Sequence, residues 1–262
     1  AGKSTLLRLL SGVLSRDSGT LKIDDEEVFD NPSVREKCFF VSDYPFFYND
    51  STVKNLASLY RKIYSNWSEK RYNQLCSLFP IDQKKRVINM SKGMQRQAAL
   101  ILALSTCPKY LFMDEIFDGL DPVVRQLLKK LIMENVAETK MTVVIASHNL
   151  RELEDVCDHI GLLHKGGVIM EKELDEMKLG IHKVQAAFNP AKTKEDFAEF
   201  DIVSFRPRGC IVNMVVRGDE KGINTKIKEM NPVFVESLPL TLEEVFINEM
   251  EGAGYDIDNI TG

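Results

Sequence analysis

The sequence has no apolar run long enough to cross a membrane: no stretch of about 18 consecutive apolar residues occurs. The most apolar stretch, Ala98–Leu104, is short and follows charged residues. No secretory signal is expected either. We therefore expect a chain that does not itself span a bilayer.

Paired cysteines and a large excess of one charge are also lacking. The five cysteines are scattered and form no Cys-x-x-Cys pair, which favours reduced, mostly buried thiols in a cytoplasmic protein, with a metal site as the alternative. The formal net charge of -5 argues against a general affinity for nucleic acid or anionic lipid.

The first residue is not Met, and the chain opens inside a motif, so we expect upstream sequence to be missing.

Apolar runs alternate with helical patterns in the first two thirds of the chain. The runs Tyr110–Met113, Thr142–Ala146 and Ile160–Leu163 are separated by helical segments at 122–138 and 149–157. This alternation predicts a parallel sheet that is buried on both faces. Further elements are predicted as a helix at 2–14 that is buried nearly all round and strands at 21–23 and 39–41.

Three cap signals divide the stretch from 52 to about 104 into helices. Thr52, Ser68 and Ser91 each precede a periodic apolar pattern, as N-cap residues do. Leu59 and Leu78 are assigned to the buried faces of the first two helices. This region is therefore predicted to be helical; the family resemblance described below implies that it belongs to a helical subdomain, at about 44–105, inserted into the sheet domain.

The pattern changes at about residue 180. Short strands are predicted at 184–188, 202–205, 211–216 and 233–236, with one helix among them at 224–230 and a closing helix at 242–250. We therefore expect two domains: an α/β domain over residues 1–178, and a small α+β appendage over residues 179–262.

The first motif that carries chemistry stands at the start of the chain. Gly2, Lys3, Ser4 and Thr5 match the end of a phosphate-binding loop and open a helix, where free N–H groups and the helix dipole favour an anion. In such a loop Lys3 reaches the β and γ phosphates, and Ser4 binds Mg²⁺. A chance tetrapeptide in front of a helix is the alternative.

Two further motifs follow apolar runs. Asp114 and Glu115 stand at the carboxyl end of a predicted buried strand, where ligands bind in open parallel sheets. Asp114 suits Mg²⁺, and Glu115 suits a general base aimed at an attacking water. His148 follows the next run and is placed to contact a phosphate. An ordinary acidic strand end and a plain polar cap are the respective alternatives.

Ser91 and Gly93 form a fourth candidate at the start of a helix. With Ser91 as N-cap, the first-turn N–H groups are free for an anion, although a plain N-cap explains the pattern equally well.

The order and spacing of these motifs, with Gly119-Leu120-Asp121 after the acid pair, resemble the ABC ATPase family of P-loop NTPases. The segment from Leu238 to Phe246 is similar to the closing helix of ATP-binding subunits from ABC-2-type exporters. Within that group, Met90-Ser91-Lys92-Gly93-Met94 and Ser65-Asn66-Trp67-Ser68 resemble bacterial bacitracin-type, acetoin-utilisation-type and phenol-soluble-modulin exporters.

The resemblance implies ATP and Mg²⁺ as cofactors and two nucleotide domains that dimerise head to tail. Glu115 is then the catalytic base and His148 the switch histidine. Gly2, Lys3, Ser4 and Thr5 then bind phosphate within one subunit. ATP is also bound across the dimer, by Ser91 and Gly93 of the signature sequence and by Asp121 of the D-loop, Gly119-Leu120-Asp121.

Magnesium is assigned to Ser4, Asp114 and Asp43. Asp43 stands where the family has the Q-loop glutamine, and this departure puts coupling to the membrane partner in doubt. The signature also departs from the family at Lys92, and Ile116-Phe117 replaces the usual Pro-Thr after the base.

The partners implied are an integral membrane permease and a second, identical or different, ATP-binding subunit, with no nucleic acid. The location implied is the cytoplasmic face of the cell membrane, and the function is to power a bacterial exporter of peptide or drug-like substrates. The aromatic cluster Tyr44, Phe46, Phe47 and Tyr48 either faces the permease or belongs to the core of the subdomain.

Three alternatives stand beside this interpretation. They are a soluble ABC ATPase without a transport role, a regulatory nucleotide-binding half with little turnover, and a P-loop kinase. The kinase is disfavoured because the Ser91-x-Gly93 and Gly119-Leu120-Asp121 motifs would then have no purpose.

Overall fold

The computed structural model describes residues 2–252, with side chains as far as Ile247. Ala1, in the opening motif, and residues 253–262, in the predicted appendage, lie outside the described residues. The chain forms two compact units: residues up to Val156 with Leu163–Gly167, and Cys157–Leu162 with the chain from Val168 onward. The boundary at 178/179 stays a prediction.

The first unit contains helices and strands in alternation. In chain order these are α1 (Lys3–Leu10), β1 (Lys22–Ile23), β2 (Glu26–Glu27), α2 (Pro32–Lys37), β3 (Cys38–Val41), α3 (Val53–Ile63), α4 (Glu69–Leu78), η1 (Val87–Asn89), α5 (Lys92–Ser105), β4 (Tyr110–Asp114), α6 (Pro122–Thr139), β5 (Thr142–Ala146) and α7 (Leu150–Leu153). The hairpin β6 (His159–His164) and β7 (Gly167–Glu173) follows, with residues in both units.

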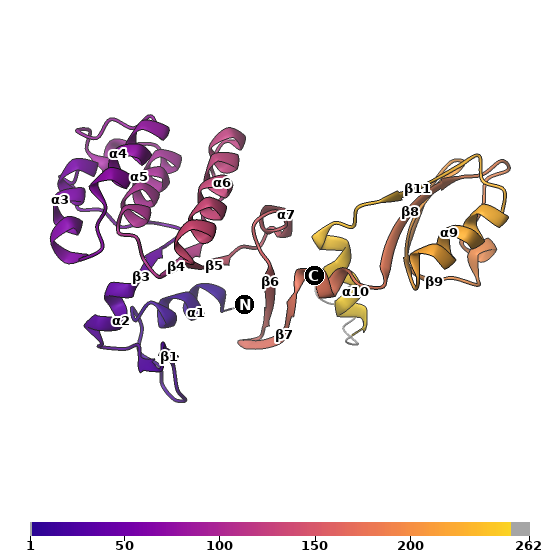
Figure 1. The fold of residues 1–262 in the computed structure, drawn as a ribbon, viewed down its shortest axis with the longest axis horizontal. Helices are drawn as coiled ribbons and strands as arrows, with labels where there is room; N and C mark the ends of the chain where they lie inside the picture. Colours follow the sequence, from indigo (N-terminus) through magenta and orange to yellow (C-terminus); the bar gives the residue numbers. More distant parts are fainter. Residues whose placement is uncertain (1, 253–262) are drawn as a thin grey trace. The chain divides into compact units, whose positions relative to one another are not determined.

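A parallel sheet in the order β3-β4-β5 forms the centre of this unit (Figure 1). Leu111 and Met113 of β4 belong to the core cluster built with α5 and α6, whereas Phe112 belongs to the cluster that contains Leu7 of α1. Successive side chains of a strand point to opposite faces, so helices cover both faces of β4. The predicted α/β fold is thereby confirmed.

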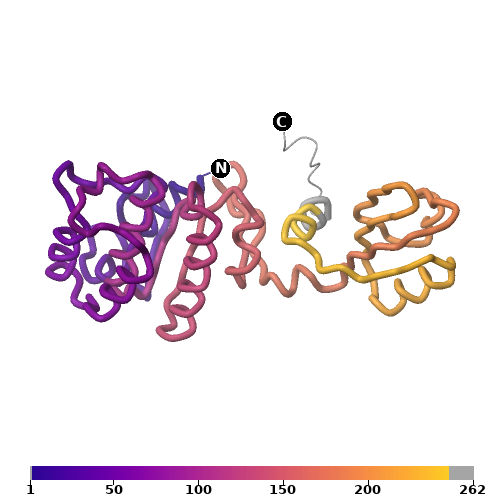
Figure 2. Tube along the Cα trace, turned by 90° about the horizontal axis from the view of Figure 1, so that it is seen from above, coloured from indigo at the N-terminus to yellow at the C-terminus, as the bar shows by residue number. Residues whose placement is uncertain are grey.

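The three predicted caps are also confirmed. The side chains of Thr52, Ser68 and Ser91 accept hydrogen bonds from first-turn N–H groups of α3, α4 and α5. Helix α6 extends without a break over 18 residues (Figure 2). Among the described residues, no helix is both long and apolar enough to cross a bilayer.

Several predictions about burial and helix length were wrong. The first helix ends at Leu10 because Gly12 takes a positive φ of 68°, and Val13 and Leu14 are 56% and 40% exposed rather than buried. Leu59 and Leu78 are likewise exposed, at 44% and 46%. The helix predicted at 149–157 is shorter in the structure, where only α7, Leu150–Leu153, is helical in this range.

The predicted strands β5 and β6 are present, but not in the setting expected. Thr142 and Val144 of β5 are exposed and lie on the same face of the strand, so this face is not covered at the first half of β5 within the described part of the chain. Strand β6 pairs with β7 and does not extend the parallel sheet.

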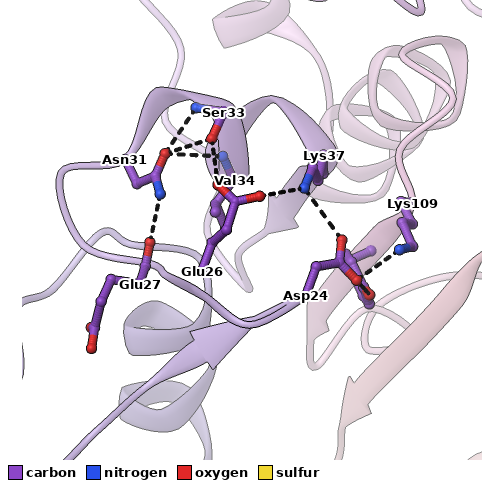
Figure 3. Close-up of polar contacts among 9 residues, drawn as sticks. Asp24, Glu26, Glu27, Asn31, Ser33, Val34, Lys37 and Lys109 are labelled. Atoms are coloured by element: carbon purple, nitrogen blue, oxygen red, sulfur yellow. Dashed lines mark hydrogen bonds and ion pairs between the residues drawn. The ribbon is translucent and has the colours of Figure 1, made fainter.

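A charged network holds the β1–β2 turn (Figure 3). Asp24, which has a positive φ of 52°, accepts hydrogen bonds from Lys109 Nζ and Tyr110 Oη, each at 2.7 Å, and pairs with Lys37 Nζ at 3.4 Å. These contacts, led by the hydrogen bond from Lys109, lower the pKa of Asp24 to about 2. Asp24 thus joins the turn to α2 and to the start of β4.

The second unit is an antiparallel sheet in the order β11-β8-β10-β9. Its elements are α8 (Leu174–Lys178), β8 (Ile181–Ala187), η2 (Lys194–Phe197), β9 (Asp201–Arg208), β10 (Ile211–Arg217), α9 (Glu220–Glu229), β11 (Phe234–Leu238) and α10 (Leu242–Gly252). Phe197 of η2 and Ile227 of α9 pack with the strands in one core. The predicted strands and both helices of this region are confirmed, whereas β7 and α8 were not predicted.

Candidate active site

The site is built where α1 begins and where two parallel strands end. Gly2 is the N-cap of α1 with φ +98°, a conformation that L side chains rarely adopt. No side chain caps this helix and no acidic residue lies in its first turn, so the helix dipole and free N–H groups of the turn are not neutralised from within it. Lys3 and Ser4, next along the helix, are half-buried.

Glu115 directly follows β4 and takes a positive φ of 48°, which is strained for a residue with a Cβ. Its N–H donates to the carbonyl of Ala146 at 2.9 Å and so joins the ends of β4 and β5. Its Oε2 accepts a hydrogen bond from the His148 N–H at 3.3 Å and lies 2.9 Å from Nδ1 of the same residue. The two residues predicted to be catalytic are therefore in direct contact.

The charges around His148 show which other groups lie close. The hydrogen bond with Glu115 raises the pKa of His148, the charges of Glu115 and Asp118 add to this, and the charge of Lys3 opposes it. When Nδ1 carries a proton, it donates to the Glu115 carboxylate. Lys3, Glu115, Asp118 and His148 thus share one electrostatic environment, with the His148 ring 65% exposed.

The acidic residues of the site fit a divalent cation. Asp114 is 3% exposed, and its Oδ1 has no hydrogen-bond partner. Because buried carboxylate oxygens are normally paired, this atom fits a cation or a water bound to one. One ligand atom each of Glu115, Asp118 and His148 lie within 4.8 Å of one another. Asp114 and this group of three are therefore the residues of the site whose chemistry suits a divalent cation.

The structure gives Ser91, Gly93 and Asp121 local roles. Ser91 Oγ accepts the Met94 N–H at 3.3 Å as N-cap of α5, and Asp121 Oδ1 accepts two N–H groups at 3.0 Å as N-cap of α6. A Cβ added to Gly93 would lie 3.2 Å from the Gly119 carbonyl oxygen. Within the described residues, no hydrogen bond or ion pair connects these three residues to Glu115 or His148.

Asp43 also lies outside this group. Its carboxylate forms an ion pair with Arg96 of α5, a residue 8% exposed. The assignment of Asp43 to Mg²⁺ stays a prediction, but the carboxylate has a partner that sequence reasoning missed.

Glu152 and Asp118 were missed as well. Glu152 is 5% exposed; it accepts from Ser147 Oγ at 3.3 Å and pairs with Arg125 of α6 at 3.5 Å, so it holds the residue before His148. Because α7 begins only at Leu150, no helical spacing links Glu152 to Ser147, and the sequence gave no signal for this contact. Asp118 lies three residues after Glu115 in the turn that follows β4, and its residue type alone gave no signal.

Comparison with known proteins identifies the family. The model of a family described as "ABC transporter" matches residues 1–118. The lantibiotic transport ATP-binding protein SrtF of Streptococcus pyogenes is 32% identical over 192 residues, which cover 72% of this chain and 80% of SrtF. The chain belongs to the ABC transporter ATP-binding proteins. This family hydrolyses ATP to power transport, and the chain is accordingly an ATP hydrolase.

Other relatives of this ABC ATPase agree. The ABC transporter ATP-binding protein YtrB of Bacillus subtilis is 29% identical over 252 residues, 96% of this chain and 86% of YtrB. The bacitracin transport ATP-binding protein BcrA of Bacillus licheniformis is 29% identical over 181 residues, 68% of this chain and 59% of BcrA. The predicted resemblance to ABC-2-type exporters, the bacitracin type included, is thereby confirmed.

Two solved structures share the fold. A structure described as the ATP-binding subunit of an ABC transporter has a TM-score of 0.62 and 25% identity, and covers 68% of this ABC ATPase and 76% of that chain. CbiO1 of Clostridium perfringens, described as part of the transporter complex CbiONQ, has a TM-score of 0.54 and 25% identity, with 67% and 74% covered.

Proposed function

We propose that this chain is the ATP-binding and hydrolysing subunit of a bacterial exporter for peptide or drug-like substrates. The observation that carries the catalytic part is the contact between Glu115 and His148 at the ends of β4 and β5, with Lys3 in the same electrostatic environment. The export part is supported by the names of BcrA and SrtF, transport proteins for bacitracin and for a lantibiotic.

In this proposal the chain binds phosphates at the start of α1 and activates water at the end of β4. The Lys3 ammonium group and the backbone N–H groups of Ser4 and Thr5 bind the phosphate oxygens and stabilise their negative charge. Glu115 accepts the proton of an attacking water, and His148 holds the Glu115 carboxylate and faces the γ-phosphate. Ser4 and Asp114 are the residues that would hold Mg²⁺, which when bound would neutralise developing charge on the phosphates.

A second ATP-binding subunit supplies the rest of the site. Ser91, Gly93 and Asp121 form no hydrogen bond or ion pair with Glu115 or His148 within the described chain, which supports their use across a head-to-tail dimer. The first-turn N–H groups of α5 suit a phosphate there. A site completed by the second subunit makes hydrolysis depend on closure of the dimer.

Replacing Lys3 tests the nucleotide site. Lys3→Ala should weaken binding of a fluorescent ATP analogue by about tenfold or more, because a charge-assisted contact to phosphate is lost. Lys130→Ala is the matched control, since Lys130 is a surface residue paired with Glu134. Equal ATP affinity in both variants would contradict the assignment of Lys3.

The partner proposed is an integral membrane permease, which would hold the chain at the cytoplasmic face of the membrane. Phe47 packs against the core, whereas Tyr44, Phe46 and Tyr48 are 72%, 81% and 65% exposed. Phe46 also lines a cavity of about 350 Å³. Exposed aromatic side chains beside a cavity suit an apolar helix end of a permease.

Co-purification tests this surface. We expect a permease to co-purify from membranes with the wild-type chain, and Phe46→Ser to abolish most of that recovery. Phe29→Ser is the control, because Phe29 is a 47% exposed aromatic residue outside the cluster. Full recovery with Phe46→Ser would refute the docking surface, and failure to recover any membrane protein would favour a soluble ABC ATPase without a transport role.

A regulatory half with little turnover remains the second candidate. The Glu115–His148 contact argues against it, because a subunit that only binds ATP needs no base.

A further inference from the structure

Arg96 occupies an unusual position in the second turn of α5. Its guanidinium is buried, with 10% of the side chain exposed, and it pairs through Nη2 with Oδ1 of Asp43. Nε and Nη2 also donate to the carbonyl oxygen of Asp43, at 3.4 and 3.3 Å. Both the side chain and the backbone of Asp43 are therefore held by one residue of α5.

The same face of α5 contacts a third segment. A Cβ added to Gly119 would lie 3.2 Å from Arg96 Nη1, and one added to Gly93 would lie 3.2 Å from the Gly119 carbonyl oxygen. Gly93 and Arg96 are three residues apart and so lie on one face of the helix. Arg96 thus lies between the loop that joins β3 to α3 (residues 42–52) and the turn that follows Glu115.

A buried guanidinium is costly unless it is paired, and its planar fork suits two acceptors on one partner. Asp43 supplies both acceptors. A carboxylate neutralised in this way attracts a divalent cation less than a free one does. The geometry therefore favours Asp43 as the counterion of Arg96 over Asp43 as an Mg²⁺ ligand.

We propose that Arg96 is a positioning residue that ties the 42–52 loop to the start of α5 and to the Gly119 turn, so that the three segments keep one arrangement during the ATPase cycle. Asp43 is its counterion. The loop carries the aromatic residues of the proposed permease surface, and α5 carries Ser91, so the ion pair connects partner docking to the dimer interface. This inference rests on the function proposed above for the same site.

A double-mutant cycle separates the two roles of Asp43. Asp43→Asn, Arg96→Gln and the double variant are compared with the wild-type chain for ATPase kcat, KM for ATP and the Mg²⁺ concentration that half-saturates nucleotide binding. We expect each single variant to lower kcat about five- to tenfold with little change in KM, and the double variant to be no worse, because all three remove one interaction. Mg²⁺ half-saturation should not change.

Arg96→Lys keeps the charge without the fork and should recover part of kcat. Arg61→Gln, which removes a surface arginine paired with Glu69 in the same subdomain, should leave kcat unchanged. An increase of about tenfold in the Mg²⁺ requirement of Asp43→Asn but not of Arg96→Gln would overturn the proposal, as would additive losses of kcat.

Hydrogen exchange supplies a readout that needs no turnover. Amides of residues 42–52 should exchange faster in Arg96→Gln than in the wild type and in Arg61→Gln. Unchanged exchange would refute the tether. A wild-type chain without ATPase activity but with this exchange difference would contradict the proposed function and leave the tether supported.

Discussion

The two compact units use their polar side chains in different ways. In the second unit, Thr193 with Asp196 and Thr241 with Glu244 close capping arrangements within three residues, and Asp219 caps α9. Glu244 also pairs with Lys183 at 2.9 Å, and among the described residues of this unit no buried side-chain nitrogen or oxygen lacks a hydrogen-bond partner. In the first unit, Glu115 and His148 meet from positions 33 residues apart, Glu115 has a strained φ, and Asp114 Oδ1 is buried without a partner. The strained backbone of Glu115 and the unpaired carboxylate oxygen of Asp114, rather than sequence separation, mark the place where chemistry is done.

The largest effect on stability is expected in the second unit. Phe197 is fully buried, and its ring contacts those of Phe188, Phe200 and Phe205 at centroid distances of 5.6, 6.0 and 5.6 Å. Phe197→Ala should destabilise this unit by about 3–5 kcal/mol in urea unfolding, because it leaves a cavity. ATP binding by the first unit should be retained.

Phe234→Ala is the control for this experiment, since Phe234 is 40% exposed. Loss of ATP binding in parallel with the unfolding of the second unit would break the comparison, because it would show that the nucleotide site depends on that unit.

Local features of both units could be predicted from the sequence. A cap such as Ser68 depends on a side-chain oxygen and an N–H three residues away, and the strand β4 depends on a continuous apolar run. Helix α2 was missed, although Asn31 before Pro32 is a cap signal of the same kind. Burial was predicted less well: Leu59 is three residues from Leu56 but is exposed. The buried face of α3 is formed by Val53, Leu56 and Ala57 with Tyr60 packed beside them, and Leu59 lies at the edge of this face.

The sequence predicted which residues form the candidate site, but not which of them contact one another. Asp114, Glu115 and His148 stand at strand ends, which a sequence shows. The Asp43–Arg96 pair joins residues 53 positions apart, and no periodicity or spacing links them. The same holds for Asp24 and Lys109, which are 85 positions apart.

A smaller effect is expected at Asp121, where a cap and a proposed dimer contact coincide. Asp121→Ala should cost about 1 kcal/mol in urea unfolding because α6 loses its N-cap, whereas Asp121→Asn should keep the cap. ATP-dependent dimerisation, measured by sedimentation, should fall in both variants if the carboxylate is used across the interface. If Asp121→Asn dimerises as fully as the wild type, Asp121 serves only as the N-cap of α6. Its role would then be purely local, like that of Asp219 in the second unit.

The smallest effect is expected at Asp24. Its pKa of about 2 in the folded chain is below the ordinary value of 3.8, so its contribution to stability is present above pH 3.8 and is lost as the pH falls toward 2. Asp24→Asn should lower the urea midpoint at pH 7, and the difference from wild type should shrink on acidification. Asn tolerates the positive φ of this position.

Asp25→Asn, in the same turn and also at positive φ, is the matched control for Asp24. A difference between Asp24→Asn and wild type that stays constant from pH 7 to pH 2.5 would mean that the ion pairs of Asp24 do not stabilise the turn.

The most direct test of the account is Glu115→Gln, measured for ATP turnover and ATP binding side by side, with the surface variant Glu134→Gln as control. Because Gln keeps the shape of the side chain but cannot accept the proton, turnover should fall by roughly 10²-fold or more while ATP affinity stays close to that of wild type. Turnover equal to that of Glu134→Gln would contradict the central claim that Glu115, held by His148 at the end of β4, is the catalytic base.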